Sequence, residues 1–266
     1  MKFVQTGIAV LCAALSSCAA AVGGLADLSV YDRSEGRALP VYWHEGRAYV
    51  VGRPGNEYQL NLRNRQGEEV LAVMSVDGVN VITGETAAVR QSGYVLSAGR
   101  AMEVKGWRKD LARTAAFYFT ALPDSYASRT GRPDNVGAIG VALYRKKRPE
   151  PVQPFADPAP IGPQSKSAER NDAAASGSSA EARSVARAPE AQLGTGHGRD
   201  EASYARHVGF ERATSEPAET VLLYYDSCRN LLARGIIPRH AAPCAVQPAP
   251  RPGPNPFPGF VTDPPA

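Results

Sequence analysis

The residues with the most chemical potential lie in one short stretch, Gly194-Thr195-Gly196-His197-Gly198-Arg199-Asp200-Glu201. A histidine between glycines, followed closely by two carboxylates, has the residue types of a general base or a metal site. His197, Asp200 and Glu201 are therefore the candidate catalytic residues. The glycines predict a loop, since glycine supplies backbone angles that other residues avoid. Two interpretations stay open: a catalytic loop, and a loop whose polar side chains bond to neighbouring backbone.

No supporting motif accompanies these residues. The sequence has no second histidine at ligand spacing, no G-x-S-x-G nucleophile elbow, and no G-K-[ST] after the glycines. We therefore predict no cofactor and no metal, and we favour a protein that is not an enzyme. A secreted hydrolase or metal-dependent enzyme centred on His197 remains the alternative.

Two further groups of residues suggest ligand chemistry. Oxygen-bearing side chains at turn-like positions could hold calcium, but they also stabilise ordinary turns; these are Asp77, Asn80, Asp134 and Asn135. Aromatic side chains on a predicted hairpin could bind sugar, which makes a carbohydrate-binding module a further alternative; these are Tyr42, Trp43 and Tyr49. We expect Trp43 and Trp107 to be core anchors, because large aromatic side chains dominate sandwich interiors.

The elements that position these residues begin with a predicted β domain at 27–148. Short runs of alternating apolar and polar residues recur there between turn residues, a pattern typical of a β-sandwich. Three turn sequences predict hairpins: His44-Glu45-Gly46, Gln66-Gly67 and Asp77-Gly78. The predicted fold class is therefore mainly β, with a β-sandwich-like domain.

Composition changes after this domain. Residues 149–191 are rich in Pro, Ala and Ser, so we predict a disordered linker. Residues 192–237 predict a small C-terminal β/α module, and residues 238–266 an extended Pro-rich tail. The elements expected in the module are strands at 203–213 and 221–225 and a short helix at 230–234, capped by Asp226 or Ser227 and ended by Gly235.

The first residues predict export. Lys2, an apolar run at 8–15 and small residues at 16–24 have the order of a signal peptide, which we place at 1–26. Cleavage after Ala21 or after Ala26 would release a soluble protein. Leu15-Ser16-Ser17-Cys18 instead has the form of a lipobox, in which the signal ends at 17 and lipidated Cys18 anchors the protein to a membrane. The predicted location is the periplasm or the outer envelope.

Cysteine content and charge agree with this setting. Cys228 and Cys244 are the candidate disulfide, since an exported protein meets an oxidising environment, although two free thiols remain possible. The net charge of +4 is mild, and acidic residues interleave with the basic ones. We therefore expect no nucleic-acid partner.

Several longer stretches resemble a group of uncharacterised exported proteobacterial proteins. They are SVDGVNVITG (75–84), QSGYVL (91–96), GWRK (106–109), AFYFT (116–120) and, nearer the C-terminus, GTGHG (194–198) and FERA (210–213). The resemblance implies a shared β domain, a variable linker and a small C-terminal module. It does not imply any particular biochemical activity. We therefore expect a non-enzymatic binding or structural protein that contacts another protein or an envelope component.

Overall fold

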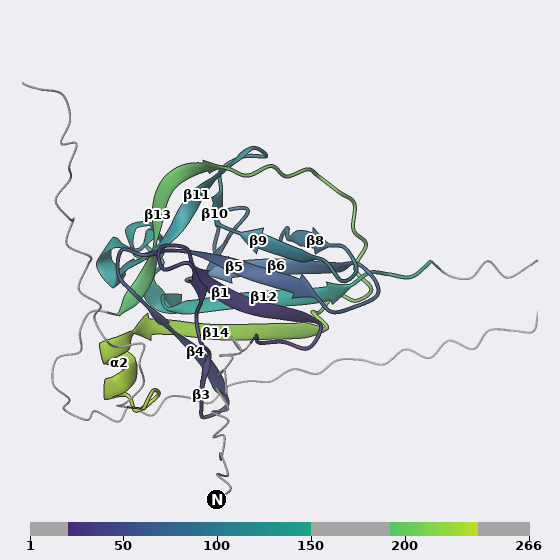
Figure 1. The fold of residues 1–266 in the computed structure, drawn as a ribbon. Helices are drawn as coiled ribbons and strands as arrows, with labels where there is room; N and C mark the ends of the chain where they lie inside the picture. Colours follow the sequence, from purple (N-terminus) through teal and green to yellow (C-terminus); the bar gives the residue numbers. More distant parts are fainter. Residues whose placement is uncertain (1–20, 150–191, 239–266) are drawn as a thin grey trace, which may run out of the picture.

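The computed structural model describes residues 21–149 and 192–238. Their strands form two sheets of seven strands each, and the main hydrophobic core lies between the sheets (Figure 1). This arrangement confirms the prediction of a mainly β, sandwich-like fold. Neighbouring strands are antiparallel except for one parallel pair, β4 and β14.

The elements are as follows. Sheet A contains β1 (Ala26–Asp32), β2 (Arg37–Ala38), β5 (Glu57–Asn64), β9 (Ala101–Val104), β10 (Gly106–Arg108), β11 (Arg113–Ala121) and β13 (Leu193–Ala202). Sheet B contains β3 (Tyr42–His44), β4 (Arg47–Gly52), β6 (Val70–Val76), β7 (Val79–Asn80), β8 (Tyr94–Leu96), β12 (Ala138–Arg145) and β14 (Glu219–Ser227). The short helices are η1 (Leu122–Asp124), α1 (Tyr126–Arg129), η2 (Pro133–Asn135) and α2 (Cys228–Ala233).

Alternation along the strands explains which face is buried. In β1, every second residue is buried, and Ala26, Leu28 and Val30 belong to the main core, as expected for a sheet with one covered face. In β6 almost every residue is buried, because Val70 and Met74 face the main core while Leu71 and Val73 face a second cluster with Tyr144. Both faces of this part of sheet B are therefore covered.

The segment 192–237, predicted as a small C-terminal module, contributes one strand to each sheet. Strand β13 pairs with β11 in sheet A, and β14 lies between β4 and β12 in sheet B. Its apolar residues Val221 and Leu223 belong to the main core. A segment this short buries enough apolar surface here because it shares the core of the larger domain.

Two of the three predicted hairpins are confirmed. Glu45 and Gly46 turn between β3 and β4, and Asp77 and Gly78 turn between β6 and β7, all four with positive φ as a type I′ turn requires. The Gln66-Gly67 hairpin is wrong. The strands on either side of it lie in different sheets, so this turn carries the chain from sheet A to sheet B.

The predicted C-terminal helix is confirmed as α2. The Ser227 hydroxyl accepts a hydrogen bond from the Asn230 backbone N–H, and Gly235 has a φ of 70° just beyond the helix. Leu231 packs with Tyr49 and Val51 on the outer face of β4. The predicted strand at 203–213 is wrong, because Arg212 forms a single bridge with Lys146 and the rest is irregular.

Residues just before β1 belong to the fold. Val22 and Leu25 lie in the main core with Ala26, and the Glu219 carboxylate accepts hydrogen bonds from the Gly24 and Leu25 backbone N–H groups at 2.6 and 2.5 Å. Cleavage after Ala21 would leave these contacts intact, whereas cleavage after Ala26 would remove them. Residues 1–20, with Cys18 and its lipobox, lie outside the described residues.

Candidate functional site

The stretch around His197 forms strand β13 and not the predicted loop. Its glycines lack the positive φ that the prediction assumed, and they serve close packing instead. A Cβ on Gly194 would lie 2.5 Å from the Cβ of Ser125, beside α1, and a Cβ on Gly196 would lie 2.2 Å from the Tyr118 ring. Glycine is required here because neighbouring side chains occupy the space over the strand.

The carboxylates predicted to assist His197 are bound to cations. Asp200 accepts hydrogen bonds from the Lys109 ammonium at 2.8 Å, and that cation lowers the pKa of the carboxyl. The His197 ring lies beside Tyr126, at 5.6 Å between ring centres. The described residues therefore do not form a set of nucleophile, base and orienting group around His197.

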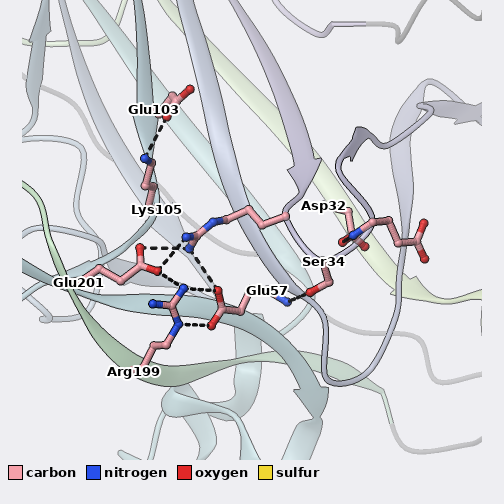
Figure 2. Close-up of polar contacts among 9 residues, drawn as sticks. Asp32, Ser34, Glu57, Glu103, Lys105, Arg199 and Glu201 are labelled. Atoms are coloured by element: carbon pink, nitrogen blue, oxygen red, sulfur yellow. Dashed lines mark hydrogen bonds and ion pairs between the residues drawn. The ribbon is translucent and has the colours of Figure 1, made fainter. Parts of the chain in front are cut away.

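Glu201 belongs to an ion-pair network on the outer side of sheet A (Figure 2). Its carboxylate lies 2.7 Å from Arg33 and 2.5 Å from Arg199, and the same two guanidiniums also contact Glu57. The hydrogen bond from Arg199 lowers the pKa of Glu57. Two positive and two negative groups balance one another, so this network connects β13 to β1 and β5 and leaves no free base.

A metal site finds no support in the described residues. No group of three or more His, Cys, Asp or Glu side chains in residues 21–149 and 192–238 is arranged to hold an ion. Asn80, one of the predicted calcium ligands, instead caps its own turn: its side-chain oxygen accepts from the Ile82 and Thr83 N–H groups.

Asp77, another of the four predicted calcium ligands, lies in a buried polar network that the sequence did not reveal. The Tyr58 hydroxyl is 2.6 Å from that of Thr195, which is 2.6 Å from that of Tyr225. Tyr225 donates to Asp77 Oδ1 at 2.5 Å, and the Thr195 backbone N–H donates to Oδ2 at 2.7 Å. The four residues come from both sheets, so the network joins the two layers.

Burial shifts the titration of this network. It raises the pKa of Asp77 from an ordinary 3.8 to about 6, although hydrogen bonds from Tyr225, Thr195 and Gly137 act in the opposite direction. It also raises the pKa of both tyrosines well above the usual value. Perturbed pKa values often mark active sites, but these side chains are at most 2% exposed, so no substrate reaches them.

The accessible candidate site is a groove of about 840 Å³ beneath residues 203–212. We call this segment the strap and the space under it the strap groove. In Figure 1 the strap is the first part of the long green coil that leaves β13 and runs around the outside of the sandwich to the start of β14. Ser203 and Ala205 are held by hydrogen bonds to the backbone of Ala112 and Leu111, and Phe210 packs on the cluster of Leu71 and Tyr144. The strap is thus anchored at both ends.

Several arginines line the strap groove without a carboxylate partner in the described chain. Arg108 donates to neutral acceptors, the shortest being the Ser203 carbonyl oxygen at 2.6 Å. Arg212 donates to the Gln91 carbonyl oxygen at 2.7 Å and lies over the Tyr144 ring at 4.3 Å. The acidic residues of the lining are each paired with a cation, at 2.7 to 3.2 Å: Glu69 with Lys146, Glu103 with Lys105 and Asp110 with Arg113. The groove therefore carries excess positive charge.

Apolar and aromatic groups complete the lining. Tyr204 on the strap is 87% exposed, and Val208 and Leu111 nearby are also exposed, whereas Tyr94 and Phe210 are partly buried. Sequence reasoning missed this site because its residues come from β8, β10 and the strap, which are distant in the chain. The one local signal was the alternation along 203–213, which we interpreted as a strand.

The predicted sugar-binding aromatics do not share a face. Tyr42 and Tyr49 are paired across β3 and β4, so they lie on the same side, and Trp43 alternates to the other side. Trp43 is 59% exposed, which corrects the prediction that it anchors the core, while Trp107 is 4% exposed, as predicted. The hairpin therefore offers no flat aromatic platform.

Cys228 is disulfide-bonded in the structure. Its predicted partner Cys244 lies outside the described residues, so the pairing of these two cysteines stays a prediction.

A search of the described helices for a membrane span finds none of sufficient length and apolar character. Comparisons with known proteins identify no relative: no family model, curated protein or solved structure matches this chain.

Proposed function

We propose that this protein is a non-enzymatic binding module of the cell envelope and that it holds part of another protein or an envelope component in the strap groove. The observation that carries the proposal is the groove itself. Its volume of about 840 Å³ falls in the usual range for ligand sites. It combines apolar walls with arginines, of which Arg108, Arg206 and Arg212 have no carboxylate partner among the described residues.

The arrangement around His197 favours binding over catalysis. Asp200 and Glu201 are engaged with Lys109, Arg33 and Arg199, and the perturbed Asp77 is buried from solvent. A hydrolase would need an accessible base with a partner that orients it. We therefore favour a binding function over the alternative of an enzyme centred on His197.

The envelope location rests on the signal-like residues 1–20 and on the disulfide at Cys228. Processing before Val22, or lipidation of Cys18, agrees with the packing of Val22 and Leu25 in the core. Mass spectrometry of the mature N-terminus tests this part. Recovery of the full chain from soluble cytosol with Met1 attached would contradict it.

Affinity capture from envelope fractions tests the binding role. The bait is the full chain, compared with a Tyr204→Ala/Arg206→Ala double variant. Both side chains are exposed, and neither forms a hydrogen bond, ion pair or ring contact with the described residues. Trp43→Ala/Arg63→Ala is the matched control, since these residues are also exposed and lie outside the groove. We expect a component that wild type and control retain and the groove variant loses. Identical capture by all three chains would refute a role for the groove.

A further inference from the structure

We propose that the strap groove recognises an acidic saccharide, with arginines binding its carboxylate or phosphate and tyrosine rings lying against its sugar rings. This inference rests on the proposed binding function and names the class of ligand.

The first argument is charge. Arginine has five N–H donors. Arg206 forms no hydrogen bond or ion pair with the described residues, while Arg212 uses one donor for the Gln91 carbonyl oxygen. Since their acceptors are neutral, Arg108 and Arg212 have no compensating carboxylate among residues 21–149 and 192–238. Since guanidinium groups match carboxylate and phosphate oxygens in geometry, an anion in the groove would satisfy donors that the described fold leaves available.

The second argument is that the acidic side chains of the lining do not pair with its arginines. Each acidic residue of the groove has a cation partner, and those partners, Lys146, Lys105 and Arg113, are not part of the lining. The negative charges of the groove are therefore neutralised by cations that lie outside its lining. An incoming anion meets the arginines with little opposing charge.

The third argument is the character of the remaining surface. The groove is lined by both aromatic and polar side chains: Tyr94, Tyr204 and Phe210, and Ser92, Ser97 and Gln91. A sugar ring presents apolar C–H faces and peripheral hydroxyl groups, so it can use both kinds of surface at once. The exposed Tyr204 offers a whole ring face for such packing.

Calorimetric titration of the full-length chain tests the proposal with defined probes. The acidic probes are trigalacturonate and glucose 6-phosphate, which separate a carboxylate from a phosphate source, and the neutral counterparts are maltotriose and glucose. Inorganic phosphate and hexaglutamate represent a free ion and an acidic peptide. We expect an acidic saccharide to bind about tenfold more tightly than its neutral counterpart, with binding weakened by added salt.

The variants locate the binding. Tyr204→Ala/Arg206→Gln is expected to lower the affinity for the acidic saccharide by at least about tenfold, and the Trp43→Ala/Arg63→Gln control to leave it unchanged. Four results would each overturn the proposal: no binding of either acidic saccharide, equal binding of the neutral counterparts, equal binding of phosphate or hexaglutamate, or no effect of the groove variant. If the capture experiment still yields a groove-dependent component, only the saccharide class is refuted; if capture also fails, the binding function is refuted with it.

Discussion

At the scale of single residues, Asp77 shows how a turn position can acquire a role in the core. Its φ of 53° belongs to the turn between β6 and β7, and its carboxylate lies among donors from β13, β14 and the start of β12. One side chain thus connects the turn to both sheets. Its protonation state should affect the whole sandwich.

The pH dependence of stability follows from this burial. The pKa of Asp77 rises on folding, from 3.8 to about 6, so folding favours the protonated form. The stabilisation is present in full below pH 3.8 and is lost as pH rises through about 6. Since one pKa unit is worth about 1.4 kcal/mol, this contribution amounts to about 3 kcal/mol.

Urea unfolding of the wild type and of Asp77→Asn between pH 4 and pH 7.5 measures the contribution of Asp77 protonation to stability. The free energy of unfolding of wild type, minus that of the variant, should grow as pH falls through about 6, because the amide does not titrate. A difference that stays constant over this range, or that grows with pH, would contradict the assignment to Asp77.

The two tryptophans provide a second prediction at this scale. Trp107 is buried and lies edge-on to Phe117, at 5.1 Å between ring centres, so Trp107→Ala should lower the free energy of unfolding by about 3–5 kcal/mol. Trp43→Ala should change it by less than about 0.5 kcal/mol, since that ring is exposed. Equilibrium denaturation of the two variants checks both values. Equal losses would mean that Trp43 packs in solution.

At the scale of elements, the residues from Val22 to Ala26 help to hold the first strand in the fold. The same stretch has the mix of small and apolar residues found at signal cleavage sites, so the sequence alone could not show which role it has. Val22 bridges to Leu28, and Glu219 of β14 holds the Gly24 and Leu25 amides. These contacts join the first strand to sheet B.

Two shortened chains test this element. A chain beginning at Val22 should unfold at the same temperature as the mature protein. A chain beginning at Asp27 should lose at least about 2 kcal/mol, because Val22 and Leu25 no longer bury their side chains. Differential scanning calorimetry compares them, and equal midpoints would show that residues before β1 contribute nothing.

Local sequence patterns predicted turns and helix caps better than they predicted which strands lie next to one another. The β6–β7 turn and the cap of α2 depend on neighbouring residues. The turn was predicted correctly, and Ser227 is one of the two caps that the sequence predicted. The Gln66-Gly67 turn failed because the choice between a hairpin and a change of sheet depends on distant strands. The prediction of a loop at β13 was wrong because it explained the glycines by their backbone freedom. In the structure, close packing against Tyr118 and Ser125 requires glycine there.

At the scale of the whole molecule, β14 holds sheet B together from within. It separates β4 from β12, and its neighbours on both sides bond to it along most of its length. The strap groove likewise requires β8, β10 and the segment before β14. The candidate site could not be predicted from sequence, since it exists only after these distant parts meet.

A chain ending at Arg148 tests this dependence. It lacks β13 and β14, so β4 and β12 lose their shared neighbour and the core loses Leu193, Val221, Leu223 and Tyr225. We expect no cooperative unfolding transition, and recovery of one when a separate polypeptide of residues 192–266 is added. A midpoint equal to that of the full chain would show that the N-terminal part folds alone.

The central place of β14 also sets the order of events during synthesis. Residues 219–227 leave the ribosome late, and until then sheet B consists of two unjoined parts. The nascent chain therefore stays without its complete native structure while nearly all of it is being made. The proposed export would need a chain that is still extended when it meets the membrane, and the strand order supplies such a delay.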